Sequence, residues 1–370
     1  MACGALAMQA AGIEIDKYIA YEVDKYAIQT AQHNFPFIEE RGDVFKADFT
    51  EYAGFDYLIG GSPCTYWSIA QTKNRETVAS GMGWELFSQY VRALHEAKPR
   101  FFLYENNKSM SAAIRASITE TFGFEPILIN SALVSAQNRQ RLYWCGIRQA
   151  DGTYKKADIQ QPADRGILLK DILETGVAWQ EKAYAYTTRC QGACVENTIK
   201  KHQHTMVAEP VNTDENGKAH TLKAQYYKNG MANFVTNGGF NATAVAEPVN
   251  ITKDGKAGTL RATYYKDGVR NLIANSIDKK TCVAMRVNEA TKAAPIYEVK
   301  DGFITVKGNK YPIKLVDGFY IIRKLTVREC MRLQTVPEWY EWPVSKSQAY
   351  KMLGNGWTVE VIAHLLRGLK

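Results

Sequence analysis

The 370-residue chain lacks any run of about 18 apolar residues, which excludes an ordinary transmembrane helix. Its apolar start, residues 1–11, lacks the basic leader of a secretory signal peptide. Cysteine is scarce, and its seven scattered residues favour a reducing compartment over a disulfide framework. These absences predict a cytoplasmic protein without a membrane partner. The length suggests about two domains.

Acidic residues are outnumbered: 46 Lys and Arg residues stand against 38 Asp and Glu residues, a net charge of +8. Residues 177–300 carry 17 basic and 11 acidic side chains, so a balance of +6 falls in this segment. A cationic middle segment makes a polyanion such as nucleic acid a plausible partner.

The first third of the chain alternates short apolar strands with amphipathic helices. Strands are expected at 18–22, 57–60 and 101–104, and helices at 25–33 and 85–97. This alternation predicts an α/β domain with a parallel, doubly wound sheet that binds ligands at the carboxyl ends of its strands. An α/β domain without any particular ligand would show the same pattern.

The character of the chain changes after about residue 175, where Gly, Asn, Thr and paired Tyr residues dominate. Residues 208–235 and 246–273 are identical at 16 of 28 positions, which indicates a duplicated β-rich unit. The two copies either pack against each other or contact phosphates and base edges. Helical sequence is expected again from Arg323, so residues 1–174 and 345–370 form one domain, interrupted by a second at 175–344.

Three segments carry candidate chemistry. Cys64 follows a buried strand and a Gly-Gly turn, where a thiolate could act as a nucleophile; an inert buried thiol is the alternative. Glu105 ends another apolar strand, where burial could favour its protonated form, although Asn106 or Asn107 could simply cap a helix. Gln137-Asn-Arg-Gln-Arg141 places two arginines on one face of an extended segment, suited to a phosphate or base edge.

In this order the segments resemble the C5-cytosine DNA methyltransferases of bacteria and phages, over nearly the whole chain. The matching motifs are Gly61-Ser-Pro-Cys64, Glu105-Asn106 (with Asn107 in place of the usual Val), Gln137-x-Arg139-x-Arg141, Asp171-Ile-Leu173, Leu325-Thr-x-x-Glu-x-x-Arg-Leu-Gln-x-x-Pro337 and Gly354-Asn-Gly-Trp-Thr-Val359. The resemblance implies a Rossmann-like, S-adenosylmethionine-dependent methyltransferase domain with a smaller, inserted β-rich target-recognition domain.

The resemblance also implies roles for individual residues. The expected catalytic residues are Cys64, Glu105, Arg139 and Arg141. The expected contacts to S-adenosylmethionine are Cys3, Gly4, Glu22, Val23, Asp43, Val44, Pro63, Leu86, Asn355 and Gly356. The expected DNA contacts are Ser68, Arg261 and Arg270. No metal is expected, because the spacing of Cys190, Cys194, His202 and His204 is unlike that of common zinc sites.

The expected partner is double-stranded DNA, bound by a monomer. A cognate restriction endonuclease could act on the same site without binding this chain. Two alternatives remain open: an RNA cytosine-5 methyltransferase, distinguished by methyl transfer to tRNA rather than plasmid DNA, and a DNA-binding relative impaired in catalysis. An amino-methyltransferase is disfavoured, because the sequence has no Asp/Asn-Pro-Pro-aromatic motif.

The family opens with a strand and a Phe-x-Gly turn, and residues 1–6 correspond only to the second half of that turn. A buried central strand pairs with both of its neighbours, so its loss leaves backbone groups unpaired. We therefore predict that a version extended upstream by a strand of about 5–6 residues melts at a higher temperature and binds S-adenosylmethionine more tightly. Equal melting temperatures and cofactor affinities for the two versions would contradict this expectation.

Overall fold

The computed structural model describes the chain except residues 64–65, 70–74, 212–273, 276–280, 283–294 and 370. The chain divides into two compact units. Unit 1 comprises Met1–Ile172, Glu181–Ala193 and Thr326–Lys370, and unit 2 comprises Leu173–Gln180 and Cys194–Leu325. This division differs from the boundaries expected from sequence, because residues 181–193 and 326–344 group with unit 1 and residues 173–174 with unit 2.

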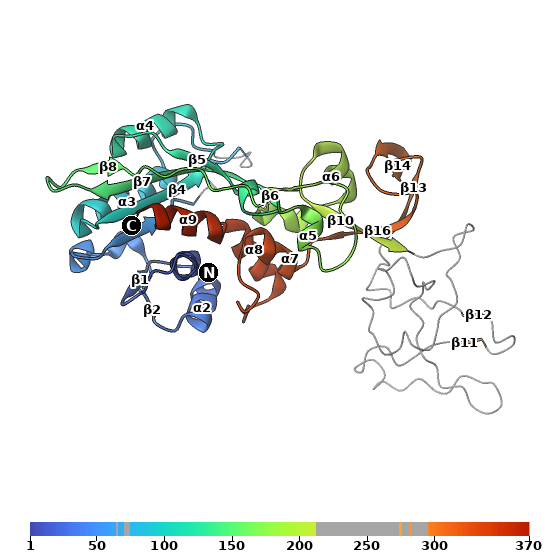
Figure 1. Cartoon of the computed structure of the whole chain (residues 1–370), viewed down its shortest axis with the longest axis horizontal. Helices are drawn as coiled ribbons and strands as arrows, with labels where there is room; N and C mark the ends of the chain where they lie inside the picture. Colours follow the sequence, from blue (N-terminus) through green and yellow to red (C-terminus); the bar gives the residue numbers. More distant parts are fainter. Residues whose placement is uncertain (64–65, 70–74, 212–273, 276–280, 283–294, 370) are drawn as a thin grey trace, which may run out of the picture. The chain divides into compact units, whose positions relative to one another are not determined.

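Unit 1 combines helices with short strands (Figure 1). Its elements are α1 (Cys3–Ala10), β1 (Tyr18–Ala20), α2 (Lys25–Asn34), β2 (Ile38–Glu40), η1 (Val44–Lys46), η2 (Phe49–Tyr52), β3 (Tyr57–Gly60), α3 (Met82–Ala97), β4 (Phe101–Asn107), α4 (Ala112–Phe122), β5 (Ile127–Asn130), η3 (Ser131–Leu133), β6 (Gln137–Asn138), β7 (Gln140–Arg148), β8 (Tyr154–Lys156), α5 (Leu169–Ile172), β9 (Ala183–Tyr184), η4 (Thr188–Gly192), α7 (Val327–Leu333), α8 (Lys346–Asn355) and α9 (Val359–Leu369).

The main sheet of unit 1 has the strand order β3-β4-β7-β5, with β8 paired to β7. β3 and β4 are parallel, whereas β7 runs antiparallel to both β4 and β5. A purely parallel sheet was expected, but the antiparallel strand β7 makes the observed sheet mixed. β1 and β2 form a separate parallel pair, and β6 pairs with β9.

The core lies on both faces of β4, whose seven residues are all buried. Aromatic and aliphatic side chains of α3 and α4 pack with Phe102 and Tyr104 of β4 and with Trp144 of β7. On the chain's last helix, α9, seven residues are buried, and it packs against α1 and β7. Figure 1 shows α4 above the strands of the sheet and α9 below them. The layered arrangement leaves the carboxyl ends of β3 and β4 available for a site.

Most elements expected in the first third are present, with shifted ends. The strand at 57–60 has the expected bounds, whereas α3 begins three residues earlier than expected. β1 ends at Ala20 rather than at residue 22, because the Glu22 carboxylate turns back to accept hydrogen bonds from its own loop. Asp24 then caps α2 by accepting from the Tyr26 amide. Its contact with the Lys351 ammonium lowers the pKa of the Asp24 carboxyl.

The helix expected from Arg323 begins instead at Val327. Arg323 belongs to β16 (Gly318–Lys324), whose backbone is paired on both sides within unit 2. Thr326 caps α7 by accepting from the Glu329 amide, while the buried Glu329 carboxylate accepts from the Thr326 amide. This reciprocal capping box gives the helix a defined start.

Unit 2 is β-rich. It contains α6 (Val195–Lys201), β10 (Met206–Val211), β11 (Ala274–Asn275), β12 (Thr281–Cys282), β13 (Ile296–Lys300), β14 (Phe303–Val306), β15 (Asn309–Pro312) and β16. An antiparallel sheet has the order β10-β16-β13-β14-β15, and β11 pairs with β12. Apart from residues 208–211 in β10, both copies of the duplicated sequence lie outside the described residues. Among the helices described here and in unit 1, none is long and apolar enough to cross a membrane.

Candidate active site

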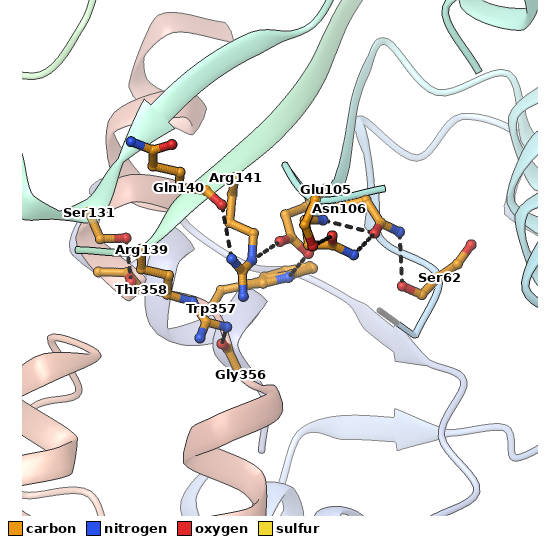
Figure 2. Close-up of polar contacts among 12 residues, drawn as sticks. Ser62, Glu105, Asn106, Ser131, Arg139, Gln140, Arg141, Gly356, Trp357 and Thr358 are labelled. Carbon is orange, nitrogen blue, oxygen red and sulfur yellow. Dashed lines mark hydrogen bonds and ion pairs between the residues drawn. The ribbon is translucent and has the colours of Figure 1, made fainter. Parts of the chain in front are cut away.

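Glu105 occupies the carboxyl end of β4 and is only 8% exposed. Arg141, two residues along β7 from the partner of Glu105 in the antiparallel register, places its Nε 3.1 Å from Glu105 Oε1. The Trp357 indole donates a hydrogen bond of 2.9 Å to Glu105 Oε2. Both carboxylate oxygens therefore have a donor, as Figure 2 shows, which satisfies a carboxylate that would be costly to bury alone.

Asn106 points away from Glu105 and holds the loop that leads toward Cys64. Its side-chain amide donates to the Ser62 carbonyl at 3.1 Å, and the Ser62 hydroxyl lies 2.7 Å from the Tyr104 hydroxyl. A Cβ on Gly61 would collide with the Glu105 carbonyl, so only glycine allows this close approach. The alternative in which Asn106 or Asn107 caps a helix is wrong, because both belong to β4.

Arg139 lies between β6 and β7 and is 3% exposed. Its guanidinium donates to the backbone carbonyls of Tyr186 at 2.7 Å and Gly356 at 2.8 Å, and to that of Gly354 at 3.5 Å. The two arginines of the motif therefore have different surroundings: Arg141 pairs with a carboxylate, whereas Arg139 binds carbonyls of two distant segments. Arg139 thereby holds the loop between α8 and α9 in place (Figure 2).

A hollow of about 450 Å³, lined by polar residues, lies beside Arg141. It is lined by Asn107, Lys108, Ser109, Asn138, Gln140 and Arg141. Lys108 Nζ donates to Gln140 Oε1 at 2.6 Å across the lining. Arg141 lines this hollow and also contacts Glu105, so the hollow and the buried carboxylate share one side chain.

The carboxyl ends of β1 and β2 present two carboxylates at one edge of their parallel sheet. Glu22 Oε1 accepts from the amides of Val23 at 2.8 Å and Asp24 at 2.9 Å, which orients the carboxylate. Asp43 accepts from the Phe45 amide at the start of η1, and Val44 packs partly buried against an aromatic cluster. Val23 is 74% exposed. Acceptors beside an exposed apolar side chain fit the ribose and adenine of a nucleoside cofactor.

The start of α1 lies against β1, β3 and the loop after α8. Gly4 packs between Tyr18 of β1 and Ile59 of β3, where any Cβ would collide with both side chains. Cys3 Sγ lies 3.9 Å from the Trp357 carbonyl, and burial raises the pKa of its thiol. A Cβ on Gly356 would come within 3.2 Å of that sulfur, so α1 and the loop after α8 are in close contact.

No described contact joins the remaining expected site residues to one another. Pro63 and Asn355 are exposed, while Ser68 and Leu86 are partly buried. Cys64, Arg261 and Arg270 lie outside the described residues. Within the part of the chain that is described, no group of three or more His, Cys, Asp or Glu side chains could hold a metal ion.

The sequence motifs assign no role to the buried polar residues that support the end of α8 and the loop at 356–358. Gln334 donates to the Leu353 carbonyl at 2.7 Å and accepts from Gln137 and from Thr358. Thr358 also lies 2.8 Å from the Ser131 hydroxyl. Trp357 and Gln334 both stand within recognised motifs, but the motifs alone do not reveal which groups they contact.

A mixed sheet with a carboxylate held at one strand end, and a separate parallel strand pair followed by two acidic side chains, fit a Rossmann-like methyltransferase fold. A family model described as C-5 cytosine-specific DNA methylase matches residues 2–370. The chain therefore belongs to the C-5 cytosine-specific DNA methylase family.

Individual relatives agree with this membership. The chain is 26% identical to the orphan methyltransferase M.SPRI of Bacillus phage SPR, over 94% of this chain and 90% of the relative. It is 27% identical to the type II methyltransferase M1.ScrFI of Lactococcus lactis subsp. cremoris, over 59% and 57%. Among solved structures, DNMT2 of Spodoptera frugiperda, in a mutant form, matches with a TM-score of 0.52 at 14% identity, covering 99% of this chain and 96% of that one.

We predict that Arg139→Lys lowers the free energy of unfolding of unit 1 by about 2–4 kcal/mol, since hydrogen bonds from charged donors contribute about 1.5–3 kcal/mol each and one ammonium cannot reach all three carbonyls. Urea denaturation followed by circular dichroism measures this loss. The control is Arg115→Lys, whose exposed side chain pairs with Glu125. Equal stability of the two variants would show that the carbonyl contacts of Arg139 contribute little.

Proposed function

We propose that the chain is a DNA (cytosine-5)-methyltransferase that transfers a methyl group from S-adenosylmethionine to C5 of a flipped cytosine within a specific duplex sequence. The observation that carries the proposal is the buried Glu105 carboxylate, which Arg141 contacts beside a polar hollow. Asn106, the next residue in the chain, donates to the carbonyl of Ser62, which precedes Cys64 by two positions in the sequence. A base inside a duplex cannot reach such a recessed site, so the target must leave the stack.

In this proposal Cys64 is the nucleophile. Its thiolate forms a bond to C6 of cytosine, which makes C5 nucleophilic. Glu105 hydrogen-bonds the N3 edge and stabilises the adduct, while Arg141 offsets developing negative charge at the carboxylate and base. After C5 is methylated, loss of the C5 proton and departure of the Cys64 sulfur restore the aromatic ring. Arg139 supports this geometry by donating to the Gly356 carbonyl, at the start of the loop between α8 and α9.

The family and the donor set at the ends of β1 and β2 support S-adenosylmethionine as the cofactor, which supplies an electrophilic methyl group when bound. Glu22 would accept from the ribose hydroxyls, Val23 would lie against the adenine, and Asp43 with Val44 would recognise the adenine edge. Cys3, Gly4 and Gly356 would line the methionine end. Pro63, Leu86 and Asn355 would complete the contacts.

Unit 2 is proposed to recognise the target sequence, as the larger part of a target-recognition domain at 175–344. Its antiparallel sheet includes β10, in which the first copy of the duplication begins. The +6 charge balance of residues 177–300 suits a phosphate backbone. Ser68, Arg261 and Arg270 are the proposed DNA contacts. The phage and type II relatives named above support an orphan or restriction-modification role in a bacterial cytoplasm.

Covalent catalysis predicts a trapped intermediate. DNA with 5-fluorocytosine at the target position cannot lose a proton from C5, so a version of the chain that binds S-adenosylmethionine should form an adduct that survives denaturing electrophoresis. Cys64→Ser should abolish this adduct. The matched control Cys194→Ser, which changes an exposed free cysteine, should retain it. Near-normal methylation by Cys64→Ser would exclude Cys64 as the nucleophile.

The recognition role predicts effects on DNA binding alone. Replacing Arg261 and Arg270 by Ala should weaken DNA binding without changing the affinity for S-adenosylmethionine. Each lost phosphate contact should reduce the slope of log affinity against log salt by about 0.9, whereas a lost base contact should cost about 1–3 kcal/mol of discrimination. Arg115→Ala in unit 1 is the control. If affinity, salt slope and site preference all stay unchanged, the duplicated unit has a structural role.

A further inference from the structure

The two donors on the Glu105 carboxylate come from very different parts of the chain. Arg141 belongs to β7, the neighbouring strand in the same sheet, and contacts Oε1. Trp357 lies 252 positions away from Glu105 in the sequence, in the short loop between α8 and α9, and its indole contacts Oε2 at 2.9 Å. The indole is a donor without acceptor capacity, so the direction of this hydrogen bond is unambiguous.

The loop that carries Trp357 is fixed on both sides of the indole. The preceding carbonyl, that of Gly356, accepts from Arg139 at 2.8 Å. The following residue, Thr358, is 1% exposed and bonds to Gln334, which is itself fully buried. Because these contacts involve buried groups, moving the loop would break several of them at once. The indole is therefore held in position before any ligand arrives.

We propose that Trp357 is a positioning residue for methyl transfer: its indole N–H fixes Glu105 Oε2 and, together with Arg141 on Oε1, orients the carboxyl group toward the target cytosine. The inference rests on the proposed function, because it assigns a task to Trp357 within that same site. Trp357 touches Glu105 rather than the base, so it acts through the carboxyl group.

A second donor matters because one contact leaves the carboxyl plane free to turn. The terminal torsion of a glutamate side chain has a broad energy profile, and a single donor on Oε1 does not define it. A donor on each oxygen defines the plane. The two donors occupy two of the roughly four lone-pair sites of the carboxyl group, so a remaining site can carry the proton that is donated to N3 of the base. Holding a group in its productive orientation removes an entropic cost from the reaction step.

The test uses Trp357→Phe, which keeps an aromatic ring but removes the N–H. The rate of adduct formation with 5-fluorocytosine DNA, measured in a single turnover over hours, should fall about ten- to hundredfold, as expected for one hydrogen bond to a charged group. Affinities for S-adenosylmethionine and DNA should change less than about twofold. In a Glu105→Gln background, where the carboxylate is already gone, the same Phe substitution should slow the reaction less than about twofold.

Two further variants separate positioning from folding. Trp144→Phe removes another indole hydrogen bond, the one to Thr119 in the core, and should leave the adduct rate unchanged while reporting the stability cost of such a loss. Trp357→His retains a ring N–H and should recover part of the rate lost in Trp357→Phe. An unchanged rate in Trp357→Phe, equal slowing with and without Glu105, or equal rates for the Phe and His variants would overturn the inference. If the version that binds S-adenosylmethionine forms no adduct even without substitutions, the proposed function itself fails.

Discussion

The described site depends on one constraint, a carboxylate buried at the end of a central strand. Burying the Glu105 carboxylate is costly unless donors satisfy its oxygens. Arg141 can supply one donor because the antiparallel register of β4 and β7 places it diagonally across from Glu105. The other donor, Trp357, requires a loop from the far end of the chain to lie against the sheet.

That loop is in turn held by Arg139, whose guanidinium donates to backbone carbonyls. Arg139 connects Tyr186 with Gly356, two segments that no sheet joins. A guanidinium is suited to this task because its donors are fixed in a planar fork. The two arginines of one motif therefore have different functions in the structure. Arg139 supports the loop, and Arg141 contacts the Glu105 carboxylate.

Several features could be predicted from the sequence because they follow local rules. The strand at 57–60 was predicted with its observed bounds, since a short apolar run ends there in two glycines. The predicted strand stops at residue 104, because Asn106 and Asn107 have polar side chains typical of helix caps. In the structure, β4 continues to Asn107. Inside the sheet those side chains find partners in each other and in the Ser62 carbonyl, so the strand tolerates them.

The order of motifs and the alternation of strands with helices were sufficient to identify the family and the class of fold. The same information left the partners of individual side chains undefined. Nothing in the local spacing distinguishes Arg139 from Arg141, yet one contacts carbonyls and the other a carboxylate. The tertiary structure alone decides this, because a hydrogen bond between distant segments depends on how helices and sheet pack. Periodicity and propensity describe only neighbours along the chain.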